Sequence, residues 1–396
     1  MLLYRLQPPL THYPWRSYLV TVNLALVGLL ALRYGPRLAL RFPVLLSVLL
    51  PTTIVAGWLA AILVSASGHV TLARPGVEND FRVFATRETL QQIFSADGFY
   101  NLGYPWLLWL ARPLFDGNAF LAARLVAALS GAVLLTATYL IARSLLPPAP
   151  ALVALVVAAL STMVAQYGLY VGSDMPFAAC VALCLALMTF AIDRTKSQEP
   201  RASGQATSKP GKSPVLSSRF ALIFLAGLAG GCAFLIRHLG LILLPWGVLV
   251  IALAALFHHE GHEKQKDQAA KALRSRSVEL ASTWRSTASR ATLVYALGFV
   301  LAMLPQLMVN TVQTGQPLYS QQAKNIWFAV YAGTDWARWN EAPNDIGLAE
   351  IVLRDPPRFF SNWYRNYGGL FRQRRRRHKG VRARDSAAPA WLPRQL

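Results

Sequence analysis

The sequence has few charged residues: Asp, Glu, Lys and Arg together make up 14% of its 396 residues. Soluble domains carry roughly 25% of such residues, so the composition argues against a soluble globular protein. Cysteine is also scarce, and its three residues all lie inside apolar stretches. Cys180 and Cys184 would share one helix face, but a pair of thiols is not a metal site. We interpret all three cysteines, including Cys232, as small packing residues.

In place of charge the sequence has long apolar runs, and 54% of its residues are hydrophobic. A hydrocarbon core about 30 Å thick requires roughly 20 mostly apolar residues per helical span. We therefore predict an all-α integral membrane protein with about eight transmembrane helices. The first run is short and could instead lie in the membrane interface. The predicted spans are 17–32, 42–65, 119–141, 151–169, 175–192, 220–236, 239–257 and 292–312.

The formal net charge of +21 would suggest a nucleic-acid partner in a soluble protein. The basic residues are instead concentrated in three connections between predicted spans, so we expect no nucleic-acid partner. The positive-inside rule places these connections on the cytoplasmic side. Alternation of the spans then predicts a multi-pass protein of the cell membrane. Its outer segments would be the N-terminus, 68–118, 170–174, the turn at Arg237 and everything after Gln313.

The predicted spans divide the chain into three parts. Residues 1–41 form an N-terminal segment, which we expect to keep its first span as an anchor because no small-residue cleavage site follows it. Residues 42–313 form the transmembrane module, whose cytoplasmic linkers are 193–219 and 258–291. Residues 314–396 form an outer segment with a basic tail, which breaks the charge rule.

Two explanations of the basic tail are open. The tail either folds against anionic lipid headgroups, or the chain is truncated or frameshifted near Phe371. We favour the second explanation. A truncated chain would have an incomplete fold and could be inactive.

The first outer loop, 68–118, is long for a connection between packed spans. Its first half is acidic, and its second half is an apolar, aromatic stretch over 99–115 that is too short to span a membrane. Tyrosine and tryptophan favour the headgroup level, so we predict an interfacial or re-entrant helix in this stretch. The acids are Glu78, Asp80, Glu88 and Asp97, and the aromatic residues include Tyr100, Tyr104, Trp106 and Trp109.

Two aspartates adjoin predicted span ends on the outer side, Asp80 in RPGVENDFRVFA and Asp174 in YVGSDMPF. Carboxylates beside a bilayer are costly to desolvate and often mark function, although ordinary loop acids are as frequent. An ionised aspartate can accept the proton of an attacking hydroxyl as a general base. It can equally orient a sugar hydroxyl or hold a divalent cation through oxygen. The sequence identifies no particular ion.

Arg237 and His238 interrupt an apolar run in FLIRHLGLILLP, again on the predicted outer side. Arginine there can pair bidentately with a phosphate, or it can extend to the headgroups from a tight turn. Arg124 and Lys324 add positive charge on the same side. We favour interface anchoring for both of these residues.

Taken in order, these segments resemble the GT-C superfamily of polytopic glycosyltransferases. They are most similar to the dolichyl-phosphate-mannose protein mannosyltransferase and aminoarabinose transferase group. The resemblance covers 42–312, where seven predicted spans match the superfamily's seven-helix module, and 17–32 is an extra helix. It is carried by the acidic motif at Glu78 and Asp80, followed by GYPWLLWLARPLF, AARLVAALSGAVLLTATYLIARSLL, SDMPF and GCAFLIRHLGLILLP, and later by QQAKNIWFAVYAGTDW.

The resemblance implies transfer of a sugar from a polyprenyl-phosphate donor to a lipid, glycan or protein acceptor at the extracytoplasmic face. It implies an inverting displacement with Asp80 as the catalytic base. Asp174 matches a position that binds acceptor or cation, and Arg237 matches a basic position that meets the donor phosphate. The candidate substrate-binding residues are Glu78, Asp174, Arg237, His238, Tyr104 and Lys324.

Two other functional classes remain open from the sequence. A transporter or lipid flippase would carry charges near mid-span and broken helices in repeated halves, whereas the notable charges here are at outer span ends. An inactive membrane scaffold would tolerate replacement of Asp80 and Asp174. Relatives of the resembled group normally carry further spans or a soluble domain after the seventh helix, and this sequence has a short basic tail there.

Overall fold

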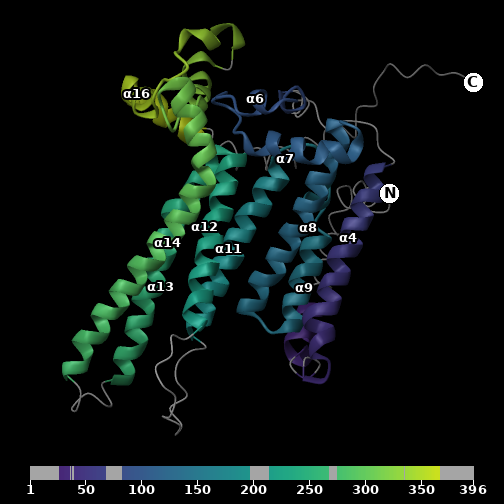
Figure 1. Ribbon diagram of the computed structural model, residues 1–396, viewed down its shortest axis with the longest axis vertical. Coiled ribbons are helices and arrows are strands. Elements are labelled where there is room, and N and C mark those ends of the chain that lie inside the picture. Colours follow the sequence, from purple (N-terminus) through teal and green to yellow (C-terminus); the bar gives the residue numbers. More distant parts are fainter. Residues whose placement is uncertain are drawn as a thin grey trace, which may run out of the picture. The chain divides into compact units, whose positions relative to one another are not determined.

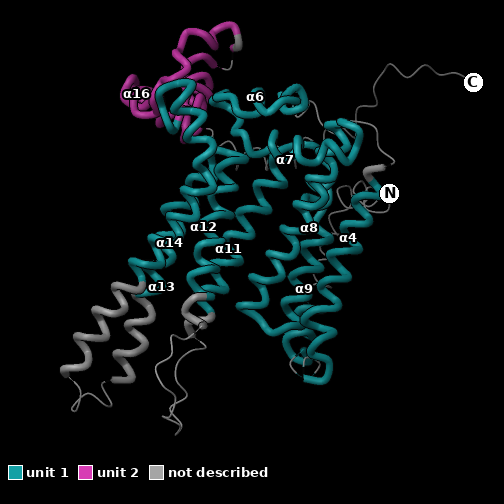
Figure 2. The backbone as a smooth tube through the Cα atoms, in the orientation of Figure 1, with its two compact units in different colours: residues 1–318 teal, residues 319–396 magenta. Residues whose placement is uncertain are grey.

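The computed structural model describes residues 26–35, 37, 40–67, 83–196, 214–266, 274–333 and 335–365. Within these ranges the regular secondary structure is helical and no strand occurs. The chain forms two compact units, 1–318 and 319–396, which Figure 2 shows in different colours. The predicted all-α fold is confirmed.

Six helical segments in the first unit are long and apolar enough to cross a membrane. They confirm six of the predicted spans to within a few residues at each end. Long apolar runs form helices because hydrocarbon offers backbone N–H and C=O groups no other partners. The segments are Leu45–Ser65, Ala119–Leu145, Asp174–Asp193, Ser218–Ile236, His238–Ala255 and Ala288–Thr314.

The predicted span 151–169 is two helices rather than one straight helix. Helix α9 (Pro148–Ala159) and helix α10 (Thr162–Leu169) meet at an angle of 55° and together would make a seventh span. Of the predicted first span, 17–32, only the end is described, in a short apolar helix Leu26–Gly35. The described residues therefore hold six candidate spans, or seven with the bent pair.

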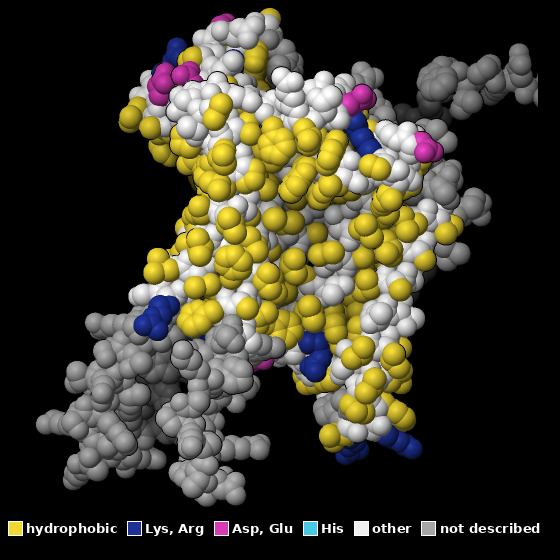
Figure 3. Space-filling model, in the orientation of Figure 1, with side chains coloured by type: hydrophobic (Ala, Val, Ile, Leu, Met, Phe, Trp, Pro, Cys, Tyr) yellow, Lys and Arg dark blue, Asp and Glu magenta, His cyan; other side chains and the backbone are white. Residues whose placement is uncertain are grey.

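The first unit is a bundle of long helices, crossed near one end by the short helix α7 (Gly103–Ala111) (Figure 1). Helix α7 and the 3-10 turn η2 (Arg112–Phe115) confirm the prediction of a short helix in the loop before residue 119. Hydrophobic side chains cover the middle of the visible face in Figure 3, as lipid contact requires. The long helices are α4 (Leu50–Ser67), α8 (Ala119–Leu145), α11 (Asp174–Lys196), α12 (Pro214–Ile236), α13 (Leu243–Lys266) and α14 (Arg274–Thr314). The short π-helix η1 (Leu45–Leu49) directly precedes α4, and the short 3-10 helix η3 (His238–Ile242) directly precedes α13.

Helices α12 and α14 pack closely because glycines line their contact. A Cβ atom added at Gly227 would lie 2.1 Å from the backbone oxygen of Tyr295, and one at Gly231 would lie 2.4 Å from that of Phe299. A Cβ atom added at Gly298 of α14 would lie 2.3 Å from the backbone oxygen of Phe224. Glycines spaced four residues apart bring helix backbones together in membranes, where dispersion replaces the hydrophobic effect as the driving force.

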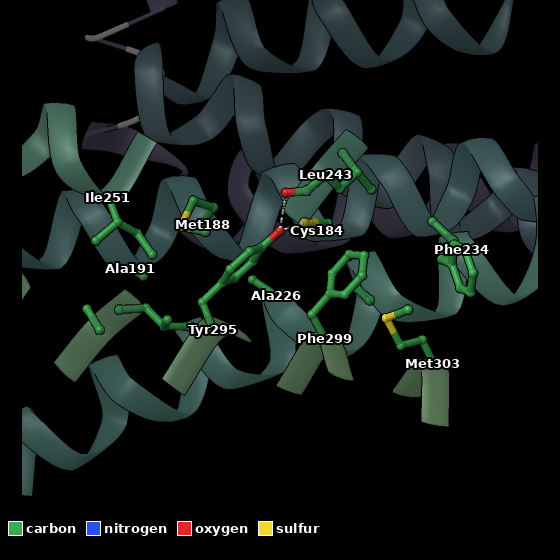
Figure 4. Packing of buried hydrophobic residues seen from close by; sticks show 14 residues of the cluster. Cys184, Met188, Ala191, Ala226, Phe234, Leu243, Ile251, Tyr295, Phe299 and Met303 are labelled. Atoms are coloured by element: carbon green, nitrogen blue, oxygen red, sulfur yellow. Dashed lines mark hydrogen bonds between the residues drawn. The ribbon is translucent and has the colours of Figure 1, made fainter. Parts of the chain in front are cut away.

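Tyr295 connects this pair to the neighbouring helices (Figure 4). Its side chain is fully buried, and its hydroxyl donates a 2.7 Å hydrogen bond to the Leu243 carbonyl at the start of α13. The Cys184 thiol of α11 lies 3.8 Å from the Tyr295 hydroxyl oxygen. Gly247 leaves space for the ring, since a Cβ there would lie 2.3 Å from it. Cys184 is buried with this cluster, in agreement with its predicted packing role.

Trp58 of α4 likewise packs neighbouring helices together, on the other side of the bundle. Its ring fills the space left by two glycines, Gly131 of α8 and Gly168 of α10, where added Cβ atoms would lie 2.2 and 2.8 Å away. Trp58 and Ile62 are buried there together with residues of α8, α9 and α10. The bent pair is thereby packed against α4 and α8, and the loop after α10 is positioned at the end of the bundle.

Gly227→Val should lower the free energy of unfolding by about 1–3 kcal/mol, because a β-branched side chain overpacks the α12–α14 contact. Gly57→Val is the matched control, since a Cβ atom at Gly57 meets nothing within 4 Å. Thermal unfolding of the two purified variants in the same lipid or detergent measures the difference. Equal stability of the two variants would contradict the close contact.

The second unit contains short helices. They are α15 (Gln322–Trp327), the π-helical turn η4 (Phe328–Ala332), the 3-10 turn η5 (Trp336–Glu341), α16 (Leu348–Arg354) and a helix over 356–365. Its buried residues include Trp327, Tyr331 and Ile351. The Tyr331 hydroxyl donates a 2.8 Å hydrogen bond to the Ile351 carbonyl and so connects η4 to α16.

Candidate functional site

The polar residues of the first unit converge where α7 crosses the end of the bundle. Gly103 permits the crossing, because a Cβ there would lie 2.6 Å from the backbone of Leu235 at the end of α12. The buried Asn101 side chain donates a hydrogen bond to the Phe234 carbonyl. The loop before α7 is therefore fixed to α12, whose next residue is a predicted site residue, Arg237.

A buried pair of side-chain amides joins the start of α7 to α14. The Leu102 N–H, unsatisfied within helix α7, donates to Gln306 Oε1 at 2.9 Å. The Gln306 amide donates to Asn310 Oδ1 at 2.8 Å, and the Asn310 amide donates to the Pro317 carbonyl at 3.0 Å. Gln306 and Asn310 are 2% and 1% exposed, so their hydrogen bonds hold α7 and α14 together rather than contacting solvent.

Asp174 and Arg237 form an ion pair at this end of the bundle. The Arg237 guanidinium lies 2.8 Å from Asp174 Oδ1, and its Nε donates a 3.0 Å hydrogen bond to Ser173 Oγ. Asp174 is the first residue of α11, where the helix dipole favours a carboxylate. Arg237 follows α12 in extended backbone. The two residues are 63 positions apart in the sequence, and the fold brings their charges together.

This ion pair is open to solvent, with side-chain exposures of 46% for Asp174 and 34% for Arg237. Exposed pairs contribute typically about 0–1 kcal/mol to stability, so the fold does not depend on it. A phosphate can compete for such a guanidinium, because Arg binds carboxylate and phosphate with the same donor geometry. The pair therefore offers one anion-binding group beside one hydrogen-bond acceptor.

Tyr104 of α7 lies beneath this pair and is fully buried. Burial raises the pKa of Tyr104, the nearby Asp174 carboxylate adds to the rise, and the Gly172 backbone opposes it. The phenol therefore stays protonated at neutral pH. Its ring also makes an edge-on contact with Phe84, with 4.8 Å between centroids. Tyr104 thus joins the loop before α8 to the residues before α11, beside the site.

His238 directly follows Arg237 at the start of η3, and its ring meets Phe234 edge-on at 5.9 Å between centroids. Gly240 allows this tight turn, because a Cβ there would lie 2.2 Å from the Phe234 nitrogen. The turn fixes the backbone position of Arg237, which connects the end of α12 to η3.

Two buried arginines hold the described part of the loop before α8, and sequence reasoning did not identify either as important. Arg87 pairs with Asp97, and the two are 8% and 22% exposed. Burial lowers the pKa of Arg87, and the Asp97 carboxylate opposes that change. Arg112, also buried, donates to the Ala85 carbonyl. The sequence shows only scattered arginines in this loop, because the partners of both are set by the fold.

Asp80 and Glu78, the predicted base and its neighbour, lie outside the described residues, so their roles stay predictions. Lys324 belongs to the second unit, where it is 2% exposed. Its ammonium donates a 2.7 Å hydrogen bond to Asn344 Oδ1 and lies 4.8 Å from the Trp339 ring centroid. Burial lowers the pKa of Lys324. Its predicted contact with substrate is untested.

The described residues hold no group of three or more His, Cys, Asp or Glu side chains that could bind a metal ion. Asp174 is paired with an arginine in this part of the chain. A divalent cation site there would need the Asp174 carboxylate to exchange its partner. The question of a metal requirement passes to experiment.

Comparison with known proteins gives one match. The family model "dolichyl-phosphate-mannose-protein mannosyltransferase" matches residues 101–203. This segment contains α7, α8, the bent pair and α11, and so it includes Tyr104 and Asp174. No curated protein and no solved structure matches the chain. The match confirms the family resemblance found in the sequence and supports a mannosyltransferase-like membrane glycosyltransferase of the GT-C type.

Proposed function

We propose that the protein transfers a sugar from a polyprenyl-phosphate donor to an acceptor at the extracytoplasmic membrane face. The observation that carries the proposal is the Asp174–Arg237 pair at the end of the bundle, within and beside the segment that matches the mannosyltransferase family. A lipid donor keeps its tail in hydrocarbon and its phosphate at the headgroup level. A reaction centre for such a donor therefore belongs at the ends of the spans, which is where the Asp174–Arg237 pair lies.

In the proposed reaction an acceptor hydroxyl attacks the anomeric carbon of the donor sugar from the face opposite the phosphate. The bond between that carbon and the phosphate oxygen breaks, and polyprenyl phosphate leaves with the electron pair. The hydroxyl proton passes to Asp80, and the configuration at the anomeric carbon inverts. Arg237 binds the donor phosphate and stabilises the charge that develops on it. Asp174 orients Arg237 and, in the complex, binds the acceptor or a cation.

The position of Asp80 in the sequence supports its place in this reaction. Phe84 contacts Tyr104, which lies beside the backbone of Gly172 and the Asp174 carboxylate. Asp80 precedes Phe84 by four residues, a stretch that reaches about 14 Å when extended. This short tether to a residue that contacts Tyr104 supports a place for Asp80 in the proposed site.

The distribution of arginines supports the proposed sidedness. Arg143 lies in the last turn of α8, whose first turn follows the outer loop. Arg219 lies early in α12, whose last residues precede Arg237. Arg290 lies near the start of the apolar part of α14. All three are at the span ends opposite the site, and the positive-inside rule assigns such ends to the cytoplasm.

A transporter or lipid flippase is the second candidate. The bend of 55° between α9 and α10 favours it, because transporters bind substrates at broken helices. The ion pairs described for the first unit, however, lie at a span end and in the loop before α8 rather than at this break. The two candidates differ in product, since only the transferase forms a new glycosidic bond.

Asp80→Asn should reduce sugar transfer by about 10²–10⁴-fold, because the amide cannot accept the hydroxyl proton. The readout is transfer from radiolabelled polyprenyl-phosphate sugars to acceptors of a membrane extract by purified protein in lipid. Asp345→Asn, at an exposed position of the second unit, is the control. Undiminished transfer by a folded Asp80→Asn protein would refute the assignment of the base.

Arg237→Gln should lower kcat/KM for the lipid donor by about 10–100-fold, since a charge-assisted hydrogen bond to phosphate is lost. Arg237→Lys should recover only part of this loss, because lysine cannot bind bidentately. Arg338→Gln removes the arginine of another exposed ion pair, with Glu341, and should leave kcat/KM unchanged. Equal effects of the Arg237 and Arg338 substitutions would contradict phosphate binding by Arg237.

A further inference from the structure

The last described helix, 356–365, is fixed to the second unit along one side. Asp355 caps its start, with Oδ1 accepting a 3.0 Å hydrogen bond from the Arg358 N–H. Pro356 and Pro357 occupy its first positions, which suit proline. Phe359 packs against the buried cluster of this unit, and the Asn362 amide donates to the Val330 carbonyl at 3.4 Å. Positions 355, 359 and 362 thus form the attached side.

Three aromatic residues of this helix are exposed. Phe360, Trp363 and Tyr364 are 57%, 58% and 74% exposed, and their spacing places them on one helical face. Leu353, which precedes the helix, is 75% exposed. Contiguous exposed apolar side chains mark interaction surfaces. Tryptophan and tyrosine in particular favour the headgroup level of membranes.

Three arginines lie in this helix or just before it. Arg354 and Arg358 both lie against the Tyr331 ring, at 5.6 and 5.2 Å from its centroid. Arg365 donates to Ser361 Oγ one turn earlier in the helix. All three arginines are exposed. Arg354 ends α16, whereas Arg358 and Arg365 are seven residues apart in the helix, which places these two on one side of it. Guanidinium groups of this kind can bind phosphates.

The connection between the two units is short. Helix α14 ends at Thr314, and the second unit begins at Tyr319. The connection reaches about 17 Å when fully extended. The headgroup region is on the order of 5–8 Å deep on each side of the hydrocarbon core, so it lies within reach of the second unit.

We propose that helix 356–365 docks on an anionic phospholipid surface. The aromatic face of Phe360, Trp363 and Tyr364 enters the headgroup region, and Arg354, Arg358 and Arg365 bind lipid phosphates. A helix with aromatic residues on one face and basic residues on another is typical of the membrane interface. The sequence that follows, beginning RQRRRRHK at Arg372, adds charge of the kind that anionic leaflets attract.

The test places a spin label at the aromatic face of the full chain. Cys180, Cys184 and Cys232 are replaced by alanine, and Trp363→Cys is labelled; Asn340→Cys, exposed in η5, is the control. The proteins are reconstituted into nanodiscs of phosphatidylcholine alone or with phosphatidylglycerol. Collision with oxygen and with a water-soluble nickel complex reports the depth of each label. The label at 363 should be lipid-exposed in the anionic discs, and the label at 340 water-exposed in both.

Removal of arginines provides the second measurement. Arg354→Gln and Arg365→Gln should each lower the ratio of docked to undocked label by about fivefold, since a basic residue near an anionic surface contributes about that factor. A water-exposed label at 363 in both kinds of disc would overturn the proposal. So would burial that is equal in both discs and insensitive to the two substitutions, because that result would indicate contact with protein, such as a second copy.

Discussion

Every backbone N–H and C=O group that enters hydrocarbon must find its partner inside the protein, and the rest of this structure follows from that constraint. The apolar runs become helices because no other conformation satisfies their backbones. Because lipid is as apolar as the helix surfaces, helices in a membrane associate through close packing. Gly227 and Gly231 allow such packing at α12. Polar side chains inside the bundle are costly. Gln306 and Asn310 offset part of this cost by hydrogen-bonding to each other.

The same constraint moves the chemistry to the ends of the spans. Asp174 begins one helix and Arg237 follows another, so both charges reach water while their helices stay in lipid. Tyr104, Asn101 and Gln306 lie just beneath and fix the elements that carry the pair. A donor whose phosphate is held at the membrane surface by its lipid tail would meet these groups without leaving the bilayer.

The sequence was sufficient for the fold class and for most span boundaries, because length and apolar content determine where a helix can cross a membrane. It did not reveal the bend between α9 and α10, since apolar content carries no information on helix direction. It indicated Asp174 and Arg237 separately as site residues, but their pairing depends on how α11 and α12 pack. Arg87 and Arg112 were missed because arginines in a loop look alike until the fold buries some of them. Asp80 rests on the family resemblance, since the described residues do not include it.

The central claim is that this protein forms a glycosidic bond from a lipid-phosphate sugar. The most direct measurement supplies the purified protein in lipid with a polyprenyl-phosphate sugar of known anomeric configuration and a membrane extract, and determines the linkage of the labelled product. The account predicts a new glycosidic bond of inverted configuration, formed from the lipid donor and not from a nucleotide sugar. A product with retained configuration would contradict the proposed displacement, and label that crosses the bilayer still attached to its lipid would identify a transporter instead.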